Sequence, residues 1–123
     1  MLTVTTDKTH YRLGEPVQIT LTLSNRSDQQ VVCYFNTAQR YDIVVSQAGR
    51  EVWRWSNDRS FAQVTGSLTL SPGQSVEYTE RWNGQDNQGT PVTPGTYTIT
   101  AQITSIGRSA HFAQEDDRSS PLH

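Results

Sequence analysis

The sequence predicts an all-β fold, and three observations lead to this prediction. Short segments alternate apolar and polar side chains with a period of two, as in a sheet with one buried face. Turn-forming residues separate these segments at intervals of about 8–12 residues, the spacing of small sandwiches. No stretch of the sequence gathers its apolar residues into a helical stripe. We therefore expect an immunoglobulin-like antiparallel β-sandwich of seven to eight strands.

The first half of the chain contains the most regular alternation. A short strand is expected over residues 2–6, and a turn with Gly and Pro follows before residue 17. Residues 17–24 predict a full strand, because every second side chain is large and aliphatic: Val17, Ile19, Leu21 and Leu23. Turn formers over residues 25–28 end this strand. Residues 31–35 predict a third strand.

The second half begins with a predicted hairpin. One strand is expected over residues 41–45 and the next over residues 51–55, with Ala48-Gly49 as the reversal between them. Alternating apolar residues predict three further strands, around positions 68–70, 76–82 and 97–103. A loop over residues 83–94 joins the last two strands. It is rich in Gly, Pro, Asn and Asp, which favour tight turns.

The length of 123 residues fits one domain, which removes about two-thirds of its unfolded surface from water on folding. We place this domain at residues 1–106. Residues 107–123 contain almost no apolar side chain beyond Phe112, and they carry the polar run Gln-Glu-Asp-Asp at 114–117. They predict a C-terminal tail that is partly disordered.

Charge and cysteine content exclude several classes of partner. A formal net charge of −2 with mixed signs provides no positive field for nucleic acid or for an anionic membrane. No apolar run approaches the ~20 residues of a membrane span. The single cysteine, Cys33, cannot form an internal disulfide, which is compatible with a reducing cytosol. We therefore expect a cytoplasmic monomer, or an extracytoplasmic protein if a leader has been removed.

No residue set in the sequence predicts catalysis. The three histidines, His10, His111 and His123, lie towards the two ends of the chain, where a buried and oriented imidazole is not expected. Glu77 and Glu80 have opposite parity on one predicted strand, so they face opposite ways and do not form an acid–base pair. The sequence therefore favours recognition over reaction, and we expect no enzyme activity.

Metal and cofactor sites are not predicted either. Asn83, Asp86 and Asn87 could supply oxygen ligands, but their spacing lacks the terminal bidentate carboxylate of a calcium loop. The cysteine and the histidines do not have the spacing of zinc ligands. Cys33 is interpreted as a small core residue rather than a reactive thiol. We expect neither a cofactor nor a bound metal.

Two of the three tryptophans, Trp53 and Trp55, lie in the predicted hairpin. On a regular strand they share one face, so that both can pack against a sheet. Alternatively, at least one is partly exposed and anchors a protein partner, because Trp and Arg are enriched at binding hot spots. Arg40 and Asp42 would then form a polar rim. The candidate partner-binding residues are Arg40, Trp53, Arg54, Trp55, Asp58, Arg59, Phe61 and Gln63.

Several motifs occur in an order that is hard to obtain by chance: Gly-Glu-Pro-Val at 14–17, Trp-Arg-Trp-Ser at 53–56, Phe-Ala-Gln at 61–63 and Leu-Ser-Pro-Gly at 70–73. In this combination the chain resembles the BsuPI family, the intracellular proteinase inhibitor of bacilli, over roughly residues 10–104. The resemblance implies an immunoglobulin-like domain whose founding member inhibits an intracellular subtilisin-type serine protease. It transfers no reactive-site residue to this chain.

Two functions of different classes follow. In the first, a loop held by the rigid sandwich enters the active-site cleft of a protease, with residues 57–63 as the first candidate and 83–93 as the second. A flat exosite or a strand edge could make the contact instead, because no disulfide braces either loop. In the second, the domain is a non-inhibitory immunoglobulin-like module for interaction or structure, for instance in a cell-envelope protein.

Overall fold

The computed structural model describes residues 1–105 and 107–108, and most of the regular structure in them is β-strand. In chain order the elements are β1 (Leu2–Thr6), β2 (Val17–Ser24), β3 (Val31–Phe35), β4 (Tyr41–Gln47), β5 (Arg50–Arg54), the 3-10 turn η1 (Trp55–Asp58), β6 (Gly66–Leu70), β7 (Ser75–Trp82), β8 (Thr98–Ile103) and β9 (Gly107–Arg108). The predicted all-β fold is confirmed.

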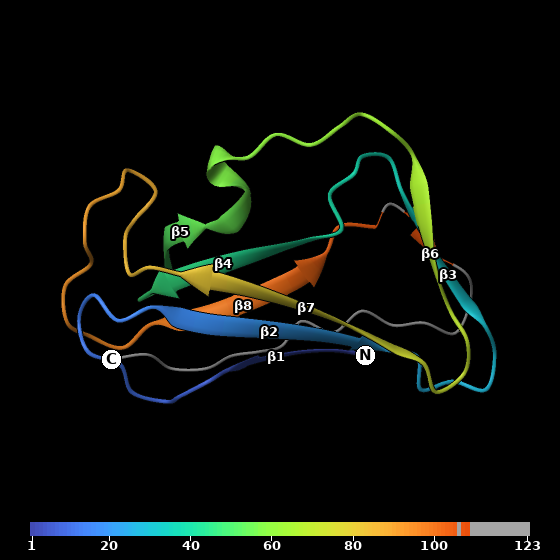
Figure 1. The fold of residues 1–123 in the computed structure, drawn as a ribbon, viewed down its shortest axis with the longest axis horizontal. Helices are drawn as coiled ribbons and strands as arrows, with labels where there is room; N and C mark the ends of the chain where they lie inside the picture. The colour runs from blue at the N-terminus through green and yellow to red at the C-terminus, as the bar shows by residue number, and fades with distance from the viewer. Residues whose placement is uncertain (106, 109–123) are drawn as a thin grey trace.

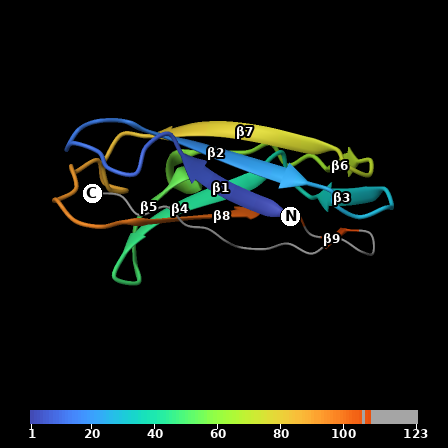
Figure 2. The same cartoon turned by 90° about the horizontal axis from the view of Figure 1, so that it is seen from below.

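The strands form three antiparallel sheets with the orders β1-β2-β7, β5-β4-β8 and β6-β3-β9. The first two sheets face each other as the layers of a sandwich, as the side view in Figure 2 shows. The third sheet lies at one end of the molecule (Figure 1). The neighbouring strands β3 and β4 therefore belong to different sheets, a division that their similar alternating patterns do not reveal.

The core lies between the two layers because alternate side chains of each strand point inward. On β2 the inward set is fully or almost fully buried, while the residues between them are exposed or partly exposed. The opposite layer contributes equally regular inward positions from β4 and β8: Ile43, Val45, Ile99, Ala101 and Ile103. Each large apolar side chain buried here contributes about 1.5–3 kcal/mol to the stability of the sandwich.

Ala48 and Gly49 join β4 to β5 as predicted. Both have positive φ, 52° and 80°, as the two-residue turn that matches the twist of a hairpin requires. The pairing register shifts between Val45 and Ser46, which marks a β-bulge. β5 ends at Arg54, one residue earlier than predicted, and the chain turns into η1.

Asn25 fastens the end of β2 to β6. Its side chain is 1% exposed, and its amide nitrogen donates to the carbonyl oxygens of Gln29 (2.8 Å) and Leu70 (2.9 Å). Its amide oxygen accepts from the backbone N–H of Ser27 (3.0 Å) and from the Ser27 hydroxyl (2.7 Å). The turn after β2 is thus held by a fully used side-chain amide, as buried polar groups require.

The shortest strand, β9, lies in the range that the sequence assigned to the tail. Gly107 and Arg108 pair with Tyr34 and Cys33 of β3. Residues 109–123, including the other predicted tail residues and two of the histidines, lie outside the described residues, so their disorder stays a prediction. Cys33 is buried, as expected for a small core residue. Among the described residues, no helix has the length and apolar character needed to cross a membrane.

Candidate functional site

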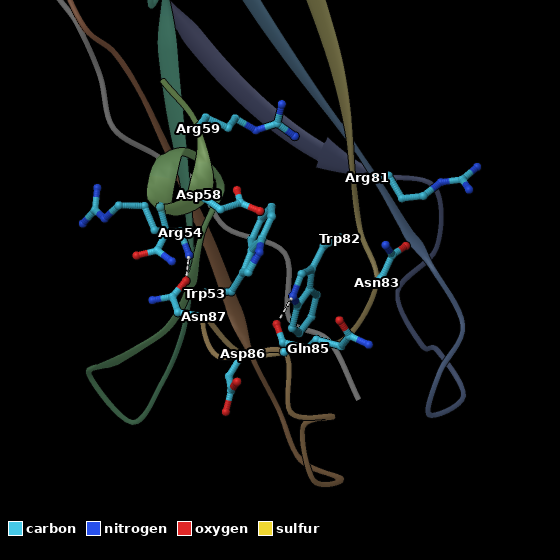
Figure 3. Close-up of a pocket in the computed structure, with 12 residues that line it drawn as sticks. Trp53, Arg54, Asp58, Arg59, Arg81, Trp82, Asn83, Gln85, Asp86 and Asn87 are labelled. Atoms are coloured by element: carbon cyan, nitrogen blue, oxygen red, sulfur yellow. Dashed lines mark hydrogen bonds between the residues drawn. The ribbon is translucent and has the colours of Figure 1, made fainter. Parts of the chain in front are cut away.

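A cleft of about 240 Å³ opens at the end of the sandwich where β5, β7 and the loop after β7 meet. The end of β5 and η1 form one wall, and the end of β7 with residues 83–89 forms the other. Figure 3 shows Trp53 and Trp82 between these walls. The two loop regions that the sequence offered as separate candidates therefore border the same cleft.

The carboxylate of Asp42 fixes the chain where the hairpin turns into η1. It is 6% exposed, and it accepts hydrogen bonds from the backbone N–H of Ile43 (2.9 Å), from Ser56 N–H and Oγ (3.2 and 2.6 Å), and from Arg54 Nη1 (3.1 Å). The expectation that Asp42 belongs to a polar rim is wrong, because its oxygens are used inside the fold. Arg54 also pairs with Glu51 (2.8 Å) and lowers the pKa of that carboxyl.

Trp55 is the central ring of an aromatic stack under η1. It is 7% exposed, and its ring lies 4.8 Å from that of Tyr41 and 5.7 Å from that of Phe61. The Arg59 guanidinium lies 4.4 Å above the Trp55 ring, while its Nε donates to the Trp55 carbonyl oxygen (3.1 Å). Trp55 therefore supports Arg59, the first residue of the segment that follows η1.

Tyr41 links this stack to the opposite layer. Its ring lies 4.6 Å from that of Tyr78 on β7, and its hydroxyl donates to the carboxylate of Glu80 on the same strand. Burial, and then the bond to Glu80, raises the pKa of the Tyr41 phenol well above its usual range. β7 is at the edge of its sheet. An inward-facing carboxylate at such an edge discourages the addition of another strand.

Trp53 lies on the cleft side of the hairpin and is partly exposed. Its ring centroid is 6.2 Å from that of Trp82, which is buried and whose indole N–H donates to the Gln85 carbonyl oxygen (2.9 Å). Tyr97 packs edge-on against Trp82 at 5.9 Å. The two tryptophans of the hairpin thus have separate neighbours, since the strand ends between them. One packs in the core and the other borders the cleft.

Residues 83–94 form a tightly hydrogen-bonded loop. Asp86 N–H donates to the Thr90 carbonyl (2.8 Å) and Val92 N–H to that of Gly84 (2.9 Å), while the Asp86 carboxylate accepts from the N–H groups of Gln88 and Thr90 (both 2.9 Å). Asp86 is therefore a turn former. Within the described part of the chain, no three His, Cys, Asp or Glu side chains come together as a metal site.

Asn87 attaches this loop to the outer edge of β5. Its backbone N–H donates to the Val52 carbonyl (3.1 Å), and its side-chain oxygen accepts from Arg54 N–H (2.8 Å). Its side-chain nitrogen donates to Glu51 (3.1 Å). Asn87 thus pairs with β5 much as a short neighbouring strand would, and it covers backbone groups that an edge strand leaves open.

Residues 59–65 form an extended segment from η1 to β6, seen along the top of Figure 1. Only Phe61 is partly buried, and Val64 is 56% exposed. Apart from the bond of Arg59 N–H to the Ser56 carbonyl of η1 (3.1 Å), the segment has one backbone hydrogen bond to the rest of the described chain, from Ala38 N–H to the Ala62 carbonyl (2.9 Å). It is therefore anchored mainly by the Phe61 ring against Trp55 and is open to solvent along most of its length.

Arg40 lies apart from the cleft, at the other end of this segment. Its guanidinium lies 4.3 Å above the Phe35 ring and donates to the Thr37 carbonyl (2.9 Å). A Cβ built on Gly66 would come within 2.5 Å of Arg40 Nη2, so the glycine gives the guanidinium room. Arg40 thus has internal contacts where the extended segment enters β6.

The eight predicted partner-binding residues therefore fall into separate places. Cleft walls contain Trp53, Arg54, Asp58 and Arg59. Trp55 and Phe61 form the stack beneath the extended segment, Gln63 is exposed on that segment, and Arg40 lies at its far end. The list of eight residues did not include the opposite wall, Arg81, Trp82, Asn83, Gln85, Asp86 and Asn87, of which the sequence offered only those within loop 83–93, as the second candidate contact. Only the turn-rich composition of the loop marked this region.

The family model described as BsuPI, intracellular proteinase inhibitor, matches residues 4–107. The chain belongs to the BsuPI family. This match spans both layers, the cleft and the extended segment, so the family resemblance drawn from the tryptophan motif is confirmed. A search of curated protein sequences found no match.

Solved structures similar to this BsuPI domain support the fold. Spo0M, a sporulation control protein from Bacillus subtilis, is 18% identical with a TM-score of 0.55, over 98% of this chain and 48% of that chain. A β-glucosidase, EmGH1 from Erythrobacter marinus, is 14% identical with a TM-score of 0.50, over 98% of this chain and 15% of that chain. The domain spans about half the length of Spo0M. At such identities the likeness concerns the fold alone.

Proposed function

We propose that this BsuPI domain inhibits an intracellular subtilisin-type serine protease by binding to its surface, and that it acts in the cytoplasm. The observation that carries the proposal is the match of a family described as an intracellular proteinase inhibitor to residues 4–107. The site is consistent with binding rather than reaction, because the cleft is lined by aromatic, amide and charged side chains, of which Arg54 is held in ion pairs with Asp42 and Glu51. The inhibitor then works by occupying the protease.

The extended segment 59–65 is the part that we expect to contact the protease. It presents exposed backbone and the apolar side chain of Val64 to solvent. A protein that binds an extended peptide forms hydrogen bonds with its main chain and receives its alternate side chains in pockets, and this segment exposes both its main chain and its side chains. Its base, by contrast, is fixed by Phe61 against Trp55 and by the bond to Ala38. Such pre-ordering reduces the entropy lost on binding.

The test is inhibition of a purified intracellular subtilisin-type protease from a bacillus, measured with a small peptide substrate while the domain is titrated. We expect saturable inhibition by the wild-type domain. Val64→Asp should weaken it strongly, because it places a charge at the centre of the contact. Leu13→Asp is the matched control, since Leu13 is also exposed (60% against 56% for Val64) but lies on the β1–β2 loop.

Two results would overturn the proposal. One is a folded wild-type domain, at a large molar excess, that leaves the activity of every such protease unchanged. The other is cleavage of the domain as an ordinary substrate, without a phase of inhibition. Either result would favour the non-inhibitory interaction module, whose partners could then be sought by capture from cell lysate with wild-type and Val64→Asp domains.

A further inference from the structure

The cleft beside the extended segment has an aromatic floor and a polar mouth. Trp53 and Trp82 lie between its walls, with ring centroids 6.2 Å apart, and Trp82 is fixed by its bond to Gln85. The volume of about 240 Å³ lies below the range of about 300–1,000 Å³ that is usual for drug-sized ligands. The cleft therefore suits one long side chain better than a cofactor.

Three arginines line this cleft, but the structure engages or directs each of them elsewhere. Arg54 is held in ion pairs with Asp42 (3.1 Å) and Glu51 (2.8 Å). Arg59 is held on Trp55 through its guanidinium and its Nε. Arg81 occupies an exposed, outward position of β7, and Figure 3 shows its side chain pointing away from the two tryptophans. The arginines thus form an outer rim rather than a binding site for an anion.

The two acidic residues of the cleft differ in whether other groups of the chain already bind their carboxylates. The Asp86 carboxylate is used by the N–H groups of Gln88 and Thr90 in its own loop. Asp58 is exposed, and its carboxylate makes no hydrogen bond or ion pair with any other described residue. In Figure 3 it lies beside Trp53. Asp58 is therefore the charged group of the cleft that is available to a ligand.

We infer that the cleft receives a basic side chain, lysine or arginine, from the protein partner. The aliphatic stem would lie against Trp53, the cationic head would pair with Asp58, and the faces of the indole rings would attract the same charge. The inference rests on the proposed function only in taking the partner to be a protein. It adds a second contact beside the extended segment, with a defined chemical preference.

A small probe tests this without the partner. Nα-acetyl-arginine methylamide is titrated into the whole 123-residue domain, and binding is followed by NMR through the indole N–H signals of Trp53 and Trp82. The neutral isostere Nα-acetyl-citrulline methylamide is the control ligand. We expect a saturable shift of the two signals with the arginine probe, weakened by added salt. The citrulline probe should produce a much smaller shift.

Variants locate the charge that is responsible. Asp58→Asn should weaken binding of the arginine probe by about threefold to tenfold, as expected for a partly exposed ion pair next to an aromatic ring. Asp28→Asn removes the same charge from an exposed turn outside the cleft and should leave binding unchanged. Equal binding of the two probes, no saturable shift, or an unchanged affinity in Asp58→Asn would each overturn the inference.

The outcome is separable from that of the proposed function. If the domain inhibits its protease but does not bind the arginine probe through Asp58, the cleft inference fails and the inhibitor function stands. If the probe binds as expected and no protease is inhibited, the cleft still recognises a basic side chain, but the partner belongs to another class of protein.

Discussion

The extended segment 59–65 and the loop 83–94 border the same cleft, but they are held in different ways. The loop is closed by backbone hydrogen bonds between Asp86 and Thr90 and between Gly84 and Val92, and Asn87 attaches it to β5. The segment has a backbone bond to η1 at its start, through Arg59, and one to the rest of the described chain, through Ala62, and it otherwise depends on aromatic side chains.

This difference indicates distinct roles for the two regions. A loop that satisfies its backbone groups internally can form a firm wall, but it leaves few of them for a partner. A segment fixed by side chains at its base keeps its own N–H and C=O groups available for pairing with a bound protein.

Removal of the aromatic support should have the largest effect on stability. Trp55→Ala deletes a ring that is 7% exposed and stacks between Tyr41 and Phe61, so we expect a loss of about 3–5 kcal/mol in the free energy of unfolding. The measurement is denaturant unfolding monitored by circular dichroism.

Trp55→Phe is the matched control. It keeps a ring in the stack and removes an indole N–H that is buried and has no hydrogen-bond partner among the described residues. Its cost should be clearly smaller than that of the alanine variant. If Trp55→Ala costs less than about 1 kcal/mol, the segment does not depend on this stack.

Removal of the Asp42 carboxylate should have the second-largest effect on stability. Asp42→Ala leaves the Ser56 N–H and hydroxyl without their acceptor and removes one partner of Arg54, so we expect a loss of about 2–3 kcal/mol. The same unfolding experiment measures it. Glu51→Ala removes the exposed partner of Arg54 and should cost less than about 1 kcal/mol. Equal costs for the two variants would contradict the structural role of Asp42.

These two positions show what local sequence could and could not predict. Alternation located β2, β4 and the hairpin turn, because the period of two follows from strand geometry. The common parity of Trp53 and Trp55 did not predict their neighbours, because the strand ends at Arg54 and the parity argument ends with it. Asp42 is predicted as a rim residue for a related reason: its partners Arg54 and Ser56 come from beyond the hairpin turn.

The cleft itself lay beyond local reasoning. Loop 83–94 was predicted as a turn-rich connection, which is correct, but its contact with β5 depends on pairing between residues far apart in sequence, such as Asn87 and Val52. No local pattern encodes that approach. A similar limit applies to Glu80: parity places it on the opposite face from Glu77, but its partner Tyr41 lies on the other layer.

The hydrogen-bonded loop should respond locally. Asp86→Ala removes the acceptor for the N–H groups of Gln88 and Thr90, and we expect a loss of about 1–2 kcal/mol. Hydrogen exchange of these two amides should accelerate well beyond that of amides in β2 and β8. Unchanged exchange at both amides would show that the loop is held by other contacts.

Alkaline pH should lower the stability of the fold through Tyr41 of the aromatic stack. The pKa of Tyr41 is higher in the folded chain than its ordinary value of 10.0, so the unfolded chain loses its proton first and stability falls as the pH rises above that value. Unfolding is measured at about pH 8 and about pH 11, on either side of the ordinary tyrosine pKa. Tyr41→Phe should reduce the pH dependence, and an identical dependence in both proteins would contradict this assignment.

The most direct test compares one exposed residue from each region in the protease inhibition assay. Val64→Asp alters the extended segment, and Gln88→Asp alters the exposed tip of the loop with the same new charge. We predict that Val64→Asp raises the apparent inhibition constant by about a hundredfold and that Gln88→Asp changes it by about twofold or less. Strong loss with Gln88→Asp and little change with Val64→Asp would contradict a contact through the extended segment and assign the contact to the loop.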